Sequence, residues 1–281
     1  MWAGYALDMS QSLPEPPPYV PPPSEAPRKT IAPLHVHHLW QWLRAGWSDM
    51  FAYPAIAAFY GSAFWVMAMV LGAVFRARPE YVMTVASGCI LVGPFLAMGL
   101  YEVSRCREQG EHPQWIASLT CWRPHMRSMG MLILVLMVLE LLWGRASLVV
   151  FAVFFNTGMP STTGVVQAIF NPENWEFVIA YTVVGGAFAA IVFATAVVSI
   201  PTILDRDVDA ITAAITSLEV VFHNTGVMVL WGGLISALVV GALLLPWGIG
   251  LLVVGPLLGH ASWHAYRGAV QWISDDLAPR A

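Results

Sequence analysis

The sequence predicts an all-α polytopic membrane protein with about six transmembrane helices, and its composition and the lengths of its apolar segments support this prediction. Hydrophobic residues make up 58% of the 281 residues and charged residues only 11%, whereas soluble domains carry roughly 25% charged residues. Six apolar segments approach the length of about 20 residues that a membrane-spanning helix needs. This composition excludes a disordered chain, a nucleic-acid-binding protein and an ordinary cytosolic enzyme, and the net charge of −4 gives no sign of polyanion binding.

The N-terminal part of the sequence has two different compositions. Nine prolines fall in residues 1–33, and such a run prefers the polyproline II conformation and cannot build a core. We expect a cytoplasmic tail here, or alternatively a strap that lies on a partner. Residues 34–54 are predicted to form a Trp-rich interfacial helix, because apolar side chains recur at three- and four-residue steps. These side chains are Val36, Leu39, Trp40, Leu43, Trp47 and Phe51.

Residues 55–270 are predicted to form the six-helix membrane domain, and residues 271–281 a C-terminal tail. The expected spans are about Ala55–Phe75, Tyr81–Tyr101, Ser128–Leu148, Phe177–Ile200, Gly226–Leu245 and Trp247–Trp263. The third apolar stretch continues to Phe155, so we expect its helix to end near Leu148 and an apolar surface segment to follow. The fourth span is expected to stop at Pro201. A surface helix over about residues 207–223 should follow, with Asp205 or Asp207 as its cap.

The distribution of basic residues predicts that both termini are cytoplasmic. With six spans, one side of the membrane receives ten basic residues: Arg28, Lys29, Arg44, Arg105, Arg107, Arg123, Arg127, Arg206, Arg267 and Arg280. The other side receives only Arg76 and Arg78, so the positive-inside bias is clear. Gly93-Pro94 recurs as Gly255-Pro256, and at that offset the first two spans fall on the last two. This indicates a parallel repeat of a helix hairpin, with chance similarity between apolar helices as the alternative.

Charged residues follow several spans on the predicted cytoplasmic side. Glu102 and Arg105 can pair at a three-residue spacing. Together with Asp205, Arg206, Asp207, His264 and Arg267 they suggest a polar belt that holds helix ends together. We predict that at least one acid–Arg pair joins the second or the sixth span to residues 205–207. Arg206 is expected to pair with a neighbouring acid or with Glu102, and binding of a divalent cation by the acids at 205, 207 and 209 is the alternative.

Histidines and one acid within a span are the candidates for chemistry. His260 and His264 are four residues apart and share one helix face, which suits a metal-binding pair. His223 and His125 are expected at the same cytoplasmic level, so a four-histidine site is one interpretation and hydrogen bonding at helix ends is the other. Glu140 lies near mid-bilayer, where an acid is costly and indicates proton or substrate handling; an interhelical hydrogen bond or a subunit contact is the alternative. No cofactor is expected, with haem or a divalent metal as the alternative.

These motifs together resemble a bacterial family of integral membrane proteins, domain of unknown function family 2189. The residues that carry the resemblance are Gly46-Trp47-Ser48-Asp49, Gly93-Pro94, Gly99-Leu100-Tyr101-Glu102-Val103-Ser104-Arg105, Ser199-Ile200-Pro201, Leu204-Asp205-Arg206-Asp207 and Gly259-His260-Ala261-Ser262-Trp263-His264-Ala265-Tyr266-Arg267. The resemblance covers about residues 40–270 and excludes the Pro-rich tail. It implies a six-helix domain in the bacterial inner membrane, but it implies no established activity and no catalytic residue.

The sequence contains no recognised catalytic motif, so no enzyme activity is expected. Together with 13 tryptophans and a long tail suited to wrapping a partner, this favours a non-catalytic accessory subunit or assembly factor of a larger membrane complex, respiratory or photosynthetic. The expected partners are membrane lipids and other subunits, and not nucleic acid. A small transporter or channel is the alternative, supported by the Gly-Pro kinks, the repeat and Glu140. A metal- or haem-binding enzyme that uses the histidines is the third hypothesis.

Overall fold

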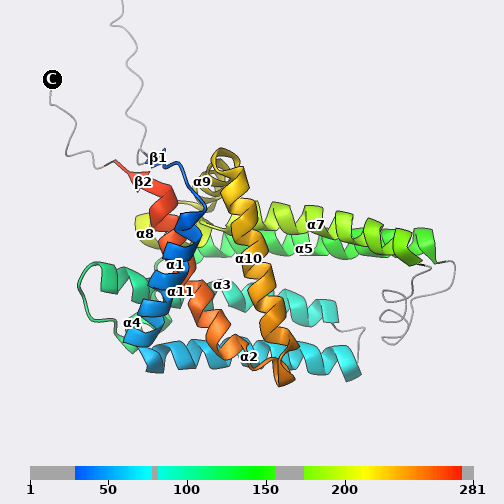
Figure 1. The fold of residues 1–281 in the computed structure, drawn as a ribbon, viewed down its shortest axis with the longest axis horizontal. Helices are drawn as coiled ribbons and strands as arrows, with labels where there is room; N and C mark the ends of the chain where they lie inside the picture. The colour runs from blue at the N-terminus through cyan, green and yellow to red at the C-terminus, as the bar shows by residue number, and fades with distance from the viewer. Residues whose placement is uncertain (1–28, 78–81, 156–173, 274–281) are drawn as a thin grey trace, which may run out of the picture.

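The structure, a computed structural model, describes residues 29–77, 82–155 and 174–273, and this part of the chain is almost entirely helical (Figure 1). The all-α prediction is therefore confirmed, while most of the predicted tails 1–33 and 271–281 lies outside the described residues. The elements in chain order are β1 (Lys29–Ile31), α1 (His37–Ala52), α2 (Pro54–Ala77), α3 (Val82–Glu108), α4 (Trp115–Thr120), α5 (Met126–Phe154), α7 (Trp175–Ala196), α8 (Ser199–Arg206), α9 (Ala210–His223), α10 (Thr225–Leu244), η3 (Pro246–Gly248), α11 (Leu251–Ala269) and β2 (Val270–Trp272).

Two pairs of long helices form a large part of the fold. Helix α2 packs against α3, and α5 packs against α7; the members of each pair run in opposite directions (Figure 1). Helix α3 also contacts α5, so the two pairs join into one body. Among the described residues, four helices are long and apolar enough to cross a membrane: α2, α5, α7 continued through α8, and α10. The chain is thus a multi-pass membrane protein.

The ends of two predicted spans differ from the structure. The expectation that the third helix stops near Leu148 is wrong, because α5 runs without a break to Phe154. A glycine such as Gly144 weakens a helix by only about 1 kcal/mol, and the exposed Arg145 does not interrupt it. Helix α7 ends at Ala196, and Pro201 lies in the first turn of α8. That proline therefore starts a helix rather than ending one, because the first turn has no intrahelical use for its missing N–H.

The cap of the surface helix α9 is Asp209, so the prediction of Asp205 or Asp207 is wrong. Asp209 Oδ1 accepts hydrogen bonds from the backbone N–H groups of Ile211 and Thr212, each at 2.8 Å, as an N-cap side chain does. Asp207 instead ends α8 in the left-handed conformation, with φ of 50°. The chain must leave that conformation before a new helix can begin, so α9 starts at Ala210.

Helix α1 is attached to α11 by the face opposite to its predicted apolar stripe. Gly46 lies so close to α11 that a Cβ atom there would be 2.7 Å from the Ala261 backbone nitrogen. Next to it Trp42 is buried and meets Trp231 of α10 edge-on, with ring centroids 5.4 Å apart. The main hydrophobic core includes both tryptophans and takes further side chains from α3, α5, α8, α9 and α11. Most of the predicted stripe, including Trp40, points outward.

Helices α10 and α11 form a hairpin whose turn contacts the middle of α2. The indole Nε1 of Trp65 donates a hydrogen bond of 2.9 Å to the backbone carbonyl of Trp247 in η3. One turn earlier in α2, a Cβ atom on Gly61 would be 2.2 Å from the Leu252 carbonyl oxygen. Trp65 is about half-way between Pro54 and Ala77, so the hairpin turn lies at the level of the α2 midpoint.

The two ends of the described chain pair with each other. Strands β1 and β2 are antiparallel, with Lys29 opposite Trp272 and Ile31 opposite Val270. Lys29 also forms an ion pair with Glu219 of α9, with Nζ and Oε2 2.8 Å apart. The segments that lead to the N- and C-terminal tails therefore lie side by side (Figure 1).

Candidate functional site

A buried polar cluster lies where α1, α3 and α11 meet. We call it the Asp49 cluster, and its members are Asp49, Ser104, Arg107, His260 and His264. Asp49 Oδ2 accepts hydrogen bonds from Ser104 Oγ at 2.6 Å and from His264 Nε2 at 2.8 Å, while Asp49 Oδ1 pairs with Arg107. Ser104 Oγ also lies 2.8 Å from His260 Nδ1. Because Ser104 uses its one proton toward Asp49, the His260 Nδ1–H donates to Ser104.

The charge of Asp49 is stabilised in spite of its burial. The residue is only 4% exposed. Burial alone would raise the pKa of Asp49, but hydrogen bonds from His264 and Ser104 outweigh it and hold that pKa below its ordinary value. The arrangement of Ser104 with a histidine and an acid does not make an accessible nucleophile, because Ser104 and His260 are fully buried. The cluster instead positions α1 against the two other helices.

A second polar group extends from this cluster toward α8 and β2. Glu108 at the end of α3 accepts hydrogen bonds from Trp263 Nε1 at 3.0 Å and from Arg267 Nε at 2.9 Å. Asp205 at the end of α8 accepts one from the Tyr266 hydroxyl at 2.6 Å, and lies 3.6 Å from Arg267 Nη1. Burial, together with contact with Asp205, raises the pKa of Tyr266, so its hydroxyl stays protonated and donates. Arg267 thus connects α3, α8 and α11.

The structure brings most of the predicted belt together. Glu102 and Arg105 form the predicted pair, with Oε2 and Nε 2.9 Å apart. The Arg267–Asp205 contact is the predicted link between the end of the sixth span and residues 205–207. Arg206 pairs with Asp205 at 3.1 Å, which agrees with pairing to a neighbouring acid rather than to Glu102.

The four predicted histidines do not converge on one site. His260 and His264 belong to the Asp49 cluster, whereas His125 Nδ1 lies 2.7 Å from Asp207 Oδ1 and His223 is exposed at the end of α9. In residues 29–77, 82–155 and 174–273, no group of three or more His, Cys, Asp or Glu side chains is arranged to hold a metal ion. The interpretation as a four-histidine metal site is therefore wrong, because helix packing gives each pair its own partners.

Residues that the sequence reasoning did not assign to the site proved central to it. The sequence patterns predict no partner for Asp49, Ser104, Arg107 or Glu108. The available signal was spacing: residues 104, 107 and 108 share one face of α3, just as residues 260, 264 and 267 share one face of α11. Two such polar faces on apolar helices are expected to meet, because lipid offers them no partner.

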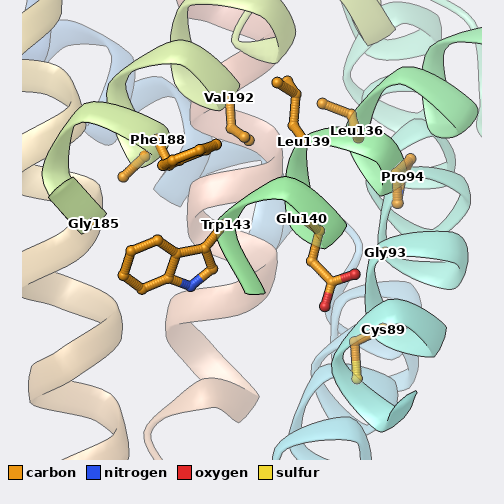
Figure 2. Close-up of a pocket in the computed structure, with 11 residues that line it drawn as sticks. Cys89, Gly93, Pro94, Leu136, Leu139, Glu140, Trp143, Gly185, Phe188 and Val192 are labelled. Carbon is orange, nitrogen blue, oxygen red and sulfur yellow. The ribbon is translucent and has the colours of Figure 1, made fainter. Parts of the chain in front are cut away.

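A cavity of about 520 Å³ lies between α3, α5 and α7, and Glu140 is part of its wall (Figure 2). Gly93 and Pro94 of α3, Trp143 of α5 and Phe188 of α7 line it as well. Figure 2 shows the Glu140 carboxylate directed toward α3, where Cys89 and Gly93 lie, while Trp143 and Phe188 form the other side. Glu140 is 8% exposed, and among the described residues of this lining it is the one that is charged.

The comparison with known protein families assigns the central part of the chain. Residues 82–205 match the family model described as "Predicted integral membrane protein (DUF2189)". This central segment is therefore similar to that family. No curated protein and no solved structure matches the chain. The match is narrower than the resemblance over residues 40–270 suggested, since it begins with α3 and ends within α8.

The two sites relate differently to the matched segment. The described residues that line the Glu140 cavity, from Cys89 to Val192, all fall within residues 82–205. The Asp49 cluster is only partly inside, because Asp49, His260 and His264 come from α1 and α11. The matched segment therefore contains the described lining of the cavity, and the helices on either side supply the polar packing.

Proposed function

We propose that this protein is a non-catalytic accessory subunit or assembly factor of a larger complex, respiratory or photosynthetic, in the bacterial inner membrane. The observation that supports this best is the outward face of α1. Trp40 is 70% exposed, Phe51 is 60% exposed and Trp47 is exposed as well, although α1 is not one of the candidate membrane spans. With Leu257 of α11, the two tryptophans border a hollow of about 280 Å³.

This face suits a protein partner because it is held rigidly. The opposite side of α1 is fixed by the close approach at Gly46 and by the buried contacts of Asp49. Large aromatic side chains on a rigid helix lose little conformational entropy when they are covered, and such residues dominate the energetics of interfaces. Tryptophan belts also occur where a lone protein meets the membrane surface, so the experiment must separate lipid from protein.

A photo-crosslinking experiment in native membranes makes that separation. Benzoylphenylalanine would replace Trp40 or Phe51 in turn, and Leu142 on the exposed side of α5 would serve as the control. We expect positions 40 and 51 to crosslink one and the same polypeptide, position 142 to crosslink lipid, and the protein to co-migrate with a large complex on a native gel. Lipid adducts at all three positions, together with an isolated particle on the gel, would refute the proposal.

We also propose a topology with both termini cytoplasmic. The positive-inside bias supports it, and so does the pairing of β1 with β2, which places the two described ends together. The sequence alone favours two full spans for α10 and α11, which would complete six. The contact of the Trp247 carbonyl with Trp65, at the middle of α2, instead favours a re-entrant hairpin whose turn stays within the bilayer. Either arrangement is compatible with the hairpin repeat, in which Pro94 of α3 corresponds to Pro256 of α11.

Labelling of single cysteines distinguishes the two arrangements. In a cysteine-free background, a cysteine at Arg76 should react with an impermeant maleimide added from the periplasmic side. A cysteine at Trp247 should react from neither side if the hairpin is re-entrant. Rapid periplasmic labelling at position 247 would instead establish six complete spans.

A small transporter is the second candidate function, and the cavity beside Glu140 is the observation that favours it. An acid at mid-bilayer on the wall of a cavity marks substrate or ion pathways in membrane proteins. Uptake by vesicles that contain the purified protein, compared with vesicles that contain Glu140→Gln, tests transport directly.

A further inference from the structure

The cavity beside Glu140 lies between α3, α5 and α7. Glu140 is fourteen residues from each end of α5 (126 to 140 and 140 to 154), which is roughly 21 Å in either direction along a helix. Gly93 and Pro94 lie near the middle of α3, and Phe188 near the middle of α7. The cavity is therefore at the depth where the surrounding hydrocarbon is least polar.

Small residues create the space and aromatic residues shape it. Nothing lies within 4 Å of the position where a Cβ atom on Gly93 would be. On the opposite side the Trp143 indole leans over Gly185, where a Cβ atom would be 3.0 Å from the ring. Trp143 is itself held by Tyr181 and Phe188, with ring centroids at 5.1 and 5.8 Å. The aromatic wall is thus already in place before any ligand arrives.

The charge of the lining determines which ligand this space suits. A carboxylate in a medium of low dielectric constant attracts a positive charge strongly and repels a negative one. The faces of Trp143 and Phe188 add to this preference, because aromatic rings attract organic cations. The rest of the lining is apolar and suits a hydrophobic body rather than a hydrated metal ion.

We propose that this cavity binds an apolar organic cation, a hydrophobic molecule with an ammonium, phosphonium or similar group, whose charge lies beside Glu140 and whose body packs against Trp143 and Phe188. Binding requires only the cavity, so the proposal holds independently of the partner complex and of whether the ligand is transported.

Two ions of nearly the same shape and opposite charge provide the test. Equilibrium binding of radiolabelled tetraphenylphosphonium and tetraphenylborate would be measured on the full-length protein in lipid nanodiscs, with protein-free nanodiscs as the partition blank. We expect saturable binding of the cation at one site, no saturable binding of the anion, and at least tenfold weaker cation binding by Glu140→Gln. Equal affinity for the two ions, no saturable cation binding, or unchanged binding by the variant would overturn the proposal.

A matched pair of alanine variants locates the ligand without changing any charge. Ala189 lines the cavity, and Ala190 beside it on α7 does not, although both are exposed. Ala189→Leu fills part of the cavity and should weaken binding of tetraphenylphosphonium at least tenfold, whereas Ala190→Leu should stay within twofold of the wild type. Thermal unfolding of each variant checks that it is folded, and this pair decides if Glu140→Gln does not fold. Equal effects of the two variants would place the ligand elsewhere and refute the proposal.

Discussion

The contact between Asp49 and His264 should contribute measurably to the attachment of α1. Their side chains come from helices that are far apart in the sequence, and Asp49 Oδ2 lies 2.8 Å from His264 Nε2. Replacement of either residue by alanine removes this hydrogen bond and leaves the other partner in a mostly buried place. We therefore expect the two single losses of stability to add up to more than the loss in the double variant.

The size of the coupling follows from the burial of the two groups. A hydrogen bond to a charged group contributes about 1.5–3 kcal/mol net. The Asp49 side chain is 6% exposed and that of His264 24% exposed, so water can replace part of the interaction on the histidine side. We expect a coupling free energy of about 1–2 kcal/mol, because that partial exposure places the value near the lower end of the range.

The assay is a double-mutant cycle on the free energy of unfolding. Asp49→Ala, His264→Ala and the double variant would be unfolded by SDS titration in mixed micelles and followed by circular dichroism. Asp49→Ala combined with His223→Ala is the control, because His223 is exposed at the end of α9 and its effect should be additive. If the Asp49 and His264 losses are also additive to within about 0.5 kcal/mol, the contact does not stabilise the protein and the reasoning fails.

Three further predictions concern contacts made by α1, α8 and α11. Gly46→Ala should destabilise the protein by about 1–3 kcal/mol, because its Cβ atom would meet the α11 backbone, while Gly130→Ala, with open space around it, should be neutral or stabilising; comparison of the two melting temperatures checks this. Asp205→Ala and Arg267→Ala should couple by about 0.2–1 kcal/mol in a similar cycle, since Arg267 is partly exposed, and strict additivity would contradict the observed link. The folded-state pKa of Asp49 lies below the unfolded value of 3.8, so the stability that its charge contributes is present above that value and lost as pH falls through the lower one. The stability advantage of the wild type over Asp49→Asn should therefore shrink in acid denaturation below about pH 4, and a constant difference down to pH 2 would be inconsistent with a charged, paired Asp49.

The positions of the long helices could be predicted because the signal is local. A membrane helix needs about 20 consecutive apolar residues, and the predicted span Ala55–Phe75 falls within α2 while Gly226–Leu245 corresponds to α10. The predicted Glu102–Arg105 pair is likewise local, since both residues lie on one face of one helix. The errors occurred where a local pattern allows two outcomes. A proline can end a helix or start one, and Pro201 starts one. Of the three acids at 205, 207 and 209, the backbone geometry makes Asp209 the cap of α9.

The sequence by itself determined that this protein is helical, spans a membrane several times and carries charged residues at one end of its spans, because hydropathy and charge act residue by residue along the chain. The match of residues 82–205 to the family model also follows from sequence alone. Only the tertiary structure decided which polar residues meet: His264 contacts Asp49, Arg267 connects Glu108 with Asp205, and Glu140 faces a cavity rather than lipid. Such contacts depend on how closely helices approach and how they are rotated, and these are set by steric details such as the missing side chain at Gly46. The periodicity of one segment does not show which face of a second, distant segment it will contact.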